Sequence, residues 1–108
     1  MTLSPVPSSA ESRQVRIVNE TGYGIQFIGV NAPGDEDWAK NRVTSVIRNG
    51  TSAQVSLVEG GNCRRDIRIA WDRKKFPPKV LKDVDLCSLR ILTLRYNQET
   101  EALSYEKR

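Results

Sequence analysis

The chain has 108 residues, of which 38% are hydrophobic and 28% are charged, and this length allows one small domain whose core needs no structural metal. The sequence contains no histidine, which excludes histidine-based catalysis, histidine-ligated metal sites and an imidazole pH switch. The net charge is +4, and no apolar run approaches the ~20 residues that a transmembrane helix needs.

The N-terminal segment, residues 1–12, is rich in serine and proline and predicts a disordered tail before a single domain over 13–108. It has neither the basic nor the apolar region of a signal peptide. Two interpretations remain: a cytoplasmic protein with a flexible tail, or a periplasmic or secreted protein whose signal peptide has been removed. The cysteines described below favour the second interpretation.

The first half of the domain reads as short strands separated by turns. Residues 14–19 predict a strand, and Asn19-Glu20-Thr21-Gly22 has turn chemistry. Residues 23–31 predict the next strand. The apolar phase of that strand changes between Phe27 and Ile28, which predicts a bulge or burial on both faces.

Three acidic residues come next along the chain, Asp35, Glu36 and Asp37. We interpret them as the N-terminus of one helical turn that continues through 38–40, because acids are favourable there. A Ca²⁺ site is the alternative, but the acids lack the alternating spacing and distal glutamate of an EF-hand loop.

A hairpin is predicted around Asn49-Gly50, with strands over 43–48 and 51–58. The clearest period-two pattern lies at 66–71, where Ile67, Ile69 and Trp71 share one face and Asp66, Arg68 and Ala70 the other. The later elements are a short edge strand at 79–81, a turn or helical turn at 83–88, a central strand at 89–96 and a last strand at 102–105. Six to eight short strands of this kind predict an all-β fold, a single antiparallel β-sandwich or small barrel.

The two cysteines, Cys63 and Cys87, either form a disulfide or pack as buried thiols. We favour the disulfide, which would close a loop of about 25 residues and stabilise the fold by roughly 3 kcal/mol. A disulfide implies an oxidising compartment.

The positive charge is concentrated in one basic stretch between Cys63 and Lys82, which carries a net +6, while the rest of the chain is slightly acidic. We predict that this stretch contacts an anionic partner, either an envelope polymer or an acidic protein surface. A solvated strand face is the alternative. The candidate binding residues are Arg64, Arg65, Arg68, Arg73, Lys74, Lys75, Phe76 and Lys79.

Phe76 admits two interpretations. Together with Trp71, Pro77 and Pro78 it forms either a protein-contact loop or a cap in which Phe76 folds back onto Trp71. Nucleic-acid binding is disfavoured because sheets that bind nucleic acid expose aromatic rings for stacking, and most rings here fall at predicted core positions.

Three short motifs resemble a group of small exported bacterial domains: Asn19-Glu20-Thr21-Gly22-Tyr23, Asp37-Trp38, and Asp85-Leu86-Cys87 preceded by Cys63. The resemblance covers about residues 15–96. It implies a β-sandwich-like fold, export and a Cys63–Cys87 pairing. It implies no catalytic residues, because no activity is established for the group.

No catalytic motif emerges, since a cysteine nucleophile lacks a histidine partner and neither a phosphate-binding loop nor a serine-hydrolase motif is present. We therefore expect a protein that is not an enzyme and needs no cofactor or metal. The expected function is a binding or structural domain outside the cytoplasm, and the alternative is an intracellular nucleic-acid-binding β-barrel.

Overall fold

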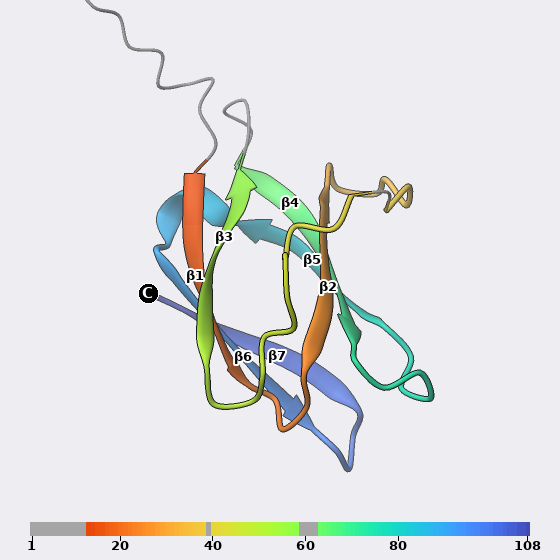
Figure 1. Ribbon diagram of the computed structural model, residues 1–108. Coiled ribbons are helices and arrows are strands. Elements are labelled where there is room, and N and C mark those ends of the chain that lie inside the picture. Colours follow the sequence, from red (N-terminus) through yellow and green to blue (C-terminus); the bar gives the residue numbers. More distant parts are fainter. Residues whose placement is uncertain (1–12, 39, 59–62) are drawn as a thin grey trace, which may run out of the picture.

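The computed structural model describes residues 13–38, 40–58 and 63–108, which form two facing sheets (Figure 1). One sheet has the strand order β3 (Ser52–Val58), β1 (Arg13–Glu20), β6 (Ile91–Asn97) and β7 (Ala102–Lys107). The other has the order β2 (Ile25–Asn31), β4 (Arg64–Trp71) and β5 (Lys79–Asp85). A 3-10 turn, Leu86–Ser88, links β5 to β6. The predicted all-β sandwich is therefore confirmed.

The predicted antiparallel pairing holds for most strands, but it is wrong for the central strands β1 and β6, which run parallel with Arg16 opposite Ile91. The chain passes through the second sheet between these two strands, so they need no tight turn between them. The predicted bulge in the second strand is present as a register shift between Ile25 and Phe27 against β4.

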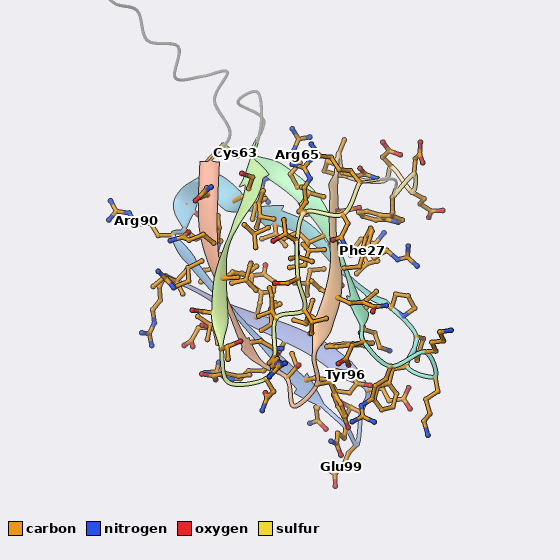
Figure 2. All side chains as sticks on the ribbon, viewed as in Figure 1. Phe27, Cys63, Arg65, Arg90, Tyr96 and Glu99 are labelled. Atoms are coloured by element: carbon orange, nitrogen blue, oxygen red, sulfur yellow. A yellow bond between two sulfur atoms is a disulfide. The ribbon has the colours of Figure 1, made fainter. Side chains whose placement is uncertain are left out.

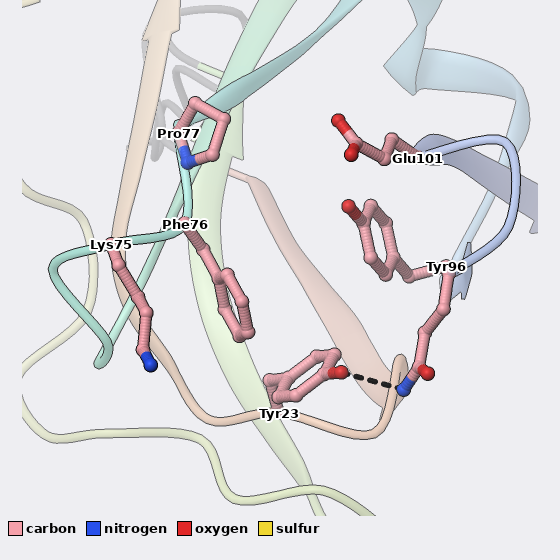
Figure 3. Close-up of a pocket in the computed structure, with 7 residues that line it drawn as sticks. Tyr23, Lys75, Phe76, Pro77, Tyr96 and Glu101 are labelled. Carbon is pink, nitrogen blue, oxygen red and sulfur yellow. Dashed lines mark hydrogen bonds between the residues drawn. The ribbon is translucent and has the colours of Figure 1, made fainter.

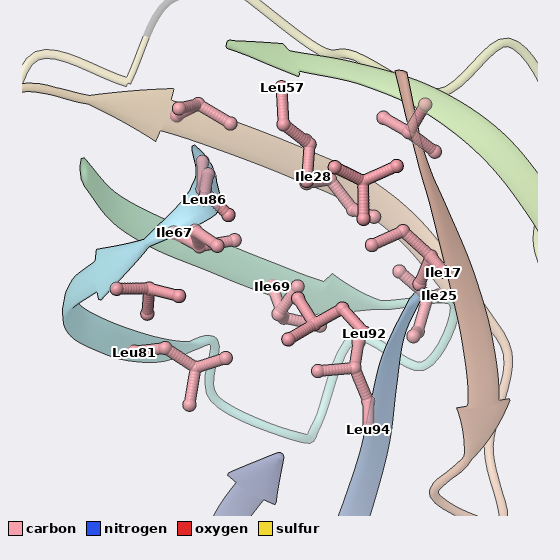
Figure 4. Packing of buried hydrophobic residues seen from close by; sticks show 14 of the residues in the cluster. Ile17, Ile25, Ile28, Leu57, Ile67, Ile69, Leu81, Leu86, Leu92 and Leu94 are labelled. Carbon is pink, nitrogen blue, oxygen red and sulfur yellow. The ribbon is translucent and has the colours of Figure 1, made fainter. Parts of the chain in front are cut away.

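The core fills the space between the sheets with aliphatic side chains (Figure 4). Alternate residues point inward in regular strands such as β1, and for this reason the period-two pattern of the sequence predicted them. The register shifts in β2 and β5 interrupt this alternation. In central β6, Leu92 and Leu94 are completely buried. Thr93, whose side chain points to the opposite face of the sheet, is also buried. The largest fully buried side chains include Ile17, Ile25, Ile28, Leu57, Ile67, Ile69, Leu86, Leu92 and Leu94.

The predicted hairpin around Asn49-Gly50 is wrong, although the turn itself is present. Ile47 forms a bridge with Ile25 of β2, whereas Ser52–Val58 pairs with β1. The chain therefore crosses from one sheet to the other at this turn, which joins two different pairing partners instead of two paired strands. Residues 43–46 form no strand.

The predicted helical turn after Asp35 is also wrong, because residues 35–38 and 40 have no helical structure. The side chain of Asn31 holds this segment by donating to the carbonyl oxygens of Asp35 and Asp37. Among the described residues, a helical turn is found at Leu86–Ser88, which lies within the segment 83–88 for which a turn or helical turn was predicted.

The predicted edge strand at 79–81 extends to Asp85. It continues past a bulge at which Asp83 has a φ of 53°, because the carboxylate of Asp66 accepts the Asp83 N–H at 2.8 Å. The same carboxylate accepts the Gly34 N–H at 2.9 Å. Asp66, predicted to share a face with Arg68, is therefore a buried polar anchor with 2% exposure.

The predicted disordered tail at residues 1–12 lies outside the described residues. Within the described part of the chain, no helix is long and apolar enough to cross a membrane.

Candidate binding site

Three connections meet at one end of the sandwich: β1 to β2, β4 to β5, and β6 to β7. They enclose a cavity of about 360 Å³, which we call the end pocket (Figure 3). Its lining residues are Tyr23, Lys75, Phe76, Pro77, Tyr96, Gln98 and Glu101. The volume is at the small end of the range of about 300–1,000 Å³ for small-molecule sites, so the end pocket suits one ring-sized group.

The floor and walls of the end pocket are aromatic. Tyr23 packs edge-on against Phe76 with ring centroids 4.7 Å apart, and its centroid lies 6.1 Å from that of Tyr96. Figure 3 shows Phe76 and Tyr96 on opposite sides of the opening, with Tyr23 below them. The buried indole of Trp71 lies 5.4 Å behind Tyr96. These rings fix one another's orientation and present a preformed apolar surface.

Tyr23 owes its position to the buried side chain of Asn19. The Asn19 amide donates to the carbonyl oxygens of Tyr23 and Ile47, both at 2.8 Å. Its oxygen accepts from the N–H and the hydroxyl of Thr21. The motif Asn19 to Tyr23 is thus a closed network that holds a pocket ring, with Gly22 at a φ of 95° allowing the turn.

The loop 72–78 carries both Phe76 and the basic turn, which we define as Arg73, Lys74 and Lys75. The Phe76 N–H donates to the Arg73 carbonyl, and the indole N–H of Trp71 donates to the Pro77 carbonyl at 3.1 Å. These bonds hold Phe76 toward the pocket and leave all three bases exposed. The guanidinium of Arg73 lies 6.0 Å from the Tyr23 centroid, within cation–π range.

Polar groups line the rim of the end pocket. Gln98 donates a hydrogen bond to the Tyr23 hydroxyl. Glu101 occupies a left-handed conformation with a φ of 57°. Burial, followed by the charge of Glu101 and the nearby Tyr23, raises the pKa of Tyr96 above its ordinary value of 10.0, so the Tyr96 hydroxyl stays protonated at neutral pH.

The remaining predicted binding residues lie away from the end pocket. Arg64 pairs with Asp83 at 3.3 Å, and Arg65 lines a separate hollow beside Asn31 and Leu57. Arg68 lies 5.8 Å from the centroid of Phe27 on β2. Figure 2 shows Arg65 and Cys63 at the end of the sandwich opposite to Tyr96. The basic stretch is therefore not one contiguous site. Of the predicted binding residues, Lys75 and Phe76 line the end pocket and Arg73 lies over the Tyr23 ring. Lys74 belongs to the same loop, and Lys79 begins β5.

Phe76 folds back against the core, as one of the two interpretations expected, and its ring packs edge-on against Tyr23. The predicted site residues did not include Tyr23, Tyr96, Gln98 or Glu101. In the sequence these residues are marked only by aromatic side chains next to predicted turns, at Tyr23 and Tyr96. This pattern does not show which turns lie at the same end of the fold. Phe27 and Trp38 lie close together over Gly29 and lie outside the buried core.

The structure bears on two further predictions, the disulfide between the two cysteines and the alternative of a Ca²⁺ site at the three acidic residues. Cys63 and Cys87 form the predicted disulfide, with Cα atoms 5.1 Å apart. It joins the start of β4 to the 3-10 turn, next to the hydrogen bond from Leu86 N–H to the Cys63 carbonyl. Asp35, Glu36 and Asp37 form no metal-binding group, and no other cluster in the described ranges does so.

Comparison with known proteins bears on the fold. The sequence matches no protein-family model and no curated protein. It is similar in structure to a solved protein described as the NMR structure of the protein from Eubacterium rectale, with a TM-score of 0.57 over 95% of this chain and 94% of that one. Because the two sequences are 12% identical, this similarity supports the fold alone.

Proposed function

We propose that the protein is a non-catalytic binding domain that contacts an anionic partner through the basic turn and the end pocket. One observation carries this proposal: Arg73, Lys74 and Lys75 are exposed on the same loop that supplies the Phe76 wall of an aromatic pocket. Basic groups attract a polyanion over several ångströms, and an adjacent preformed pocket adds a short-range contact.

We further propose that the domain works outside the cytoplasm, as the resemblance to small exported bacterial domains implies. The Cys63–Cys87 disulfide supports this location, because such bonds persist in oxidising compartments. Intact-mass measurement of unreduced, alkylated protein from its native compartment tests it. A bridged, unalkylated chain supports export, whereas two alkylated thiols would contradict it.

Nucleic-acid binding is the second candidate, and the end pocket gives it one supporting observation. Aromatic rings beside basic residues are the combination with which proteins hold single-stranded nucleic acid. The disulfide argues against this candidate, because nucleic acids are concentrated in reducing compartments where such bonds are rare.

Salt-dependent binding to inorganic polyphosphate tests the anionic partner. We expect affinity to fall steeply as ionic strength rises from about 0.05 to about 0.3 M. The variant Arg73→Glu/Lys74→Glu/Lys75→Glu should lose binding. The matched control Arg16→Glu/Arg90→Glu/Lys107→Glu makes the same change in net charge on exposed residues in β1, just before β6 and in β7. It should retain most of the binding. Equal losses in both variants would show that only net charge matters and would refute a localised site.

A further inference from the structure

We infer that the end pocket takes the sugar ring of an acidic polysaccharide, with the ring between Phe76 and Tyr96 and its carboxylate toward Lys75. This inference rests on the proposed function and names the class of its anionic partner. The size of the pocket, the arrangement of its rings and the charges around its rim support it.

The pocket geometry fits a single ring. The cavity of about 360 Å³ is bounded by Phe76 on one side and Tyr96 on the other, with Tyr23 as its floor (Figure 3). A pyranose has one face lined with C–H groups that carry partial positive charge. Such a face packs well against the negative face of an aromatic ring. The rings are held in place by Trp71 and by the Asn19 network, so little ordering is needed on binding.

The polar lining matches hydroxyl groups. Gln98 offers an amide, Glu101 a carboxylate acceptor and Tyr96 a hydroxyl that stays protonated at neutral pH. Because Glu101 is an acceptor, it favours a ligand that brings hydrogen-bond donors into the pocket. It disfavours a phosphate there, since two negative charges would be close together.

Lys75 supplies the preference for an acidic sugar. It lies on the Phe76 side of the pocket, away from Glu101 on the Tyr96 side (Figure 3). A carboxylate on the sugar ring can meet this ammonium group while the hydroxyls face Gln98 and Glu101. Arg73 and Lys74 of the same loop extend the positive surface for the neighbouring residues of an anionic chain.

The experiment compares four probes by calorimetry: a galacturonic acid trimer, a neutral galactose trimer, polyphosphate matched in charge to the acidic trimer, and oligothymidylate. It uses the wild type, Tyr96→Ala and the control Tyr105→Ala, which removes an exposed tyrosine on β7. Because Tyr96 packs on Trp71, Lys75→Gln serves as a second variant on an exposed residue.

We expect the acidic trimer to bind more tightly than polyphosphate, and Tyr96→Ala to weaken it roughly tenfold while Tyr105→Ala leaves it unchanged. Lys75→Gln should abolish most of the preference for the acidic over the neutral trimer. Polyphosphate and the acidic trimer binding equally, with no effect of either pocket variant, would overturn the sugar inference and leave the anionic partner standing.

Three other results are also decisive. Tighter, Tyr96-dependent binding of oligothymidylate would overturn the inference in favour of nucleic acid. Binding of the neutral trimer alone would overturn both the acidic preference and the proposed anionic partner. Absence of binding to all four probes would refute the proposed function together with the inference.

Discussion

Asn19 is the residue on which the geometry of the end pocket depends most. Its side chain is fully buried and makes hydrogen bonds to Thr21, Tyr23 and Ile47. Buried polar networks of this kind are costly to break, because each group left unpaired loses its hydration without compensation.

Asn19→Ala should lower the free energy of unfolding by about 3 kcal/mol, since the buried Thr21 N–H loses its acceptor and two carbonyls lose a donor. Urea unfolding measures this. The control Asn49→Ala removes one exposed contact, to the Gly22 N–H, and should cost about 1 kcal/mol or less. Similar losses in both variants would mean that the buried network is not the stabilising feature.

Glu101 is a second residue whose placement has a cost. A non-glycine residue in the left-handed region is destabilised by roughly 1–2 kcal/mol, and glycine is preferred at this position of a hairpin loop. Such strain near a pocket is an indication of function.

We predict that Glu101→Gly raises the free energy of unfolding by about 1 kcal/mol while weakening binding of the galacturonic acid trimer. The two effects oppose each other, and thermal unfolding with calorimetric titration separates them. Increased stability with unchanged affinity would remove Glu101 from the proposed site.

Among the elements, the pairing of β4 with β5 is stabilised by the carboxylate of Asp66 on β4. It accepts hydrogen bonds from Asp83 in the bulge of β5 and from Gly34 in the loop after β2. Burial acts to raise the pKa of Asp66. The hydrogen bonds from Gly34 and Asp83 and the charge of Lys82 outweigh it, so the pKa lies below the ordinary value of 3.8.

The lowered pKa of Asp66 makes the free energy of unfolding depend on pH. A lowered pKa in the folded state contributes stability above the unfolded pKa, and this stability is lost as the pH falls through the folded pKa. Asp66→Asn should therefore be less stable than wild type by about 2 kcal/mol at pH 7, and the gap should narrow below about pH 4. Urea unfolding curves at several pH values measure this difference in stability between variant and wild type. A difference that does not change with pH would contradict an ionised Asp66 carboxylate as the stabilising group.

The disulfide is the covalent link between elements. It spans 24 residues of sequence, so replacing both cysteines by serine should lower the free energy of unfolding by about 3 kcal/mol. Adding a reductant to wild type should produce the same loss, while the double variant should be insensitive to it. A variant as stable as the oxidised wild type would show that the bond does not constrain the unfolded chain.

The elements also show where sequence reasoning succeeds and where it stops. Strands at 14–19, 66–71 and 89–96 were predictable, because a half-buried or central strand leaves its side-chain period in the sequence. The hairpin at Asn49-Gly50 was not, because the same turn residues serve a crossing between sheets. Pairing partners depend on contacts far apart in sequence, such as Ile25 with Ile47.

In the molecule as a whole, the candidate site also depends on contacts between residues that are far apart in sequence, so its position was not predictable. The basic stretch is continuous in sequence, but β4 is eight residues long and carries the chain about 25 Å from one end of the sandwich to the other. Arg64 and Arg65 are thereby separated from Arg73 to Lys75. The reverse holds for Tyr23, Phe76 and Tyr96, which are distant in sequence and meet at one end.

NMR titration tests, residue by residue, whether ligand binds at the end of the sandwich where these three connections meet. Isotope-labelled protein is titrated with the galacturonic acid trimer, and amide shifts are mapped on the fold. We predict the largest shifts at Tyr23, at Lys75 and Phe76, and at Gln98 to Glu101. Shifts centred instead on Arg64 and Arg65, or on Arg16 in β1 and Arg90 just before β6, would contradict the assignment of the end pocket as the binding site.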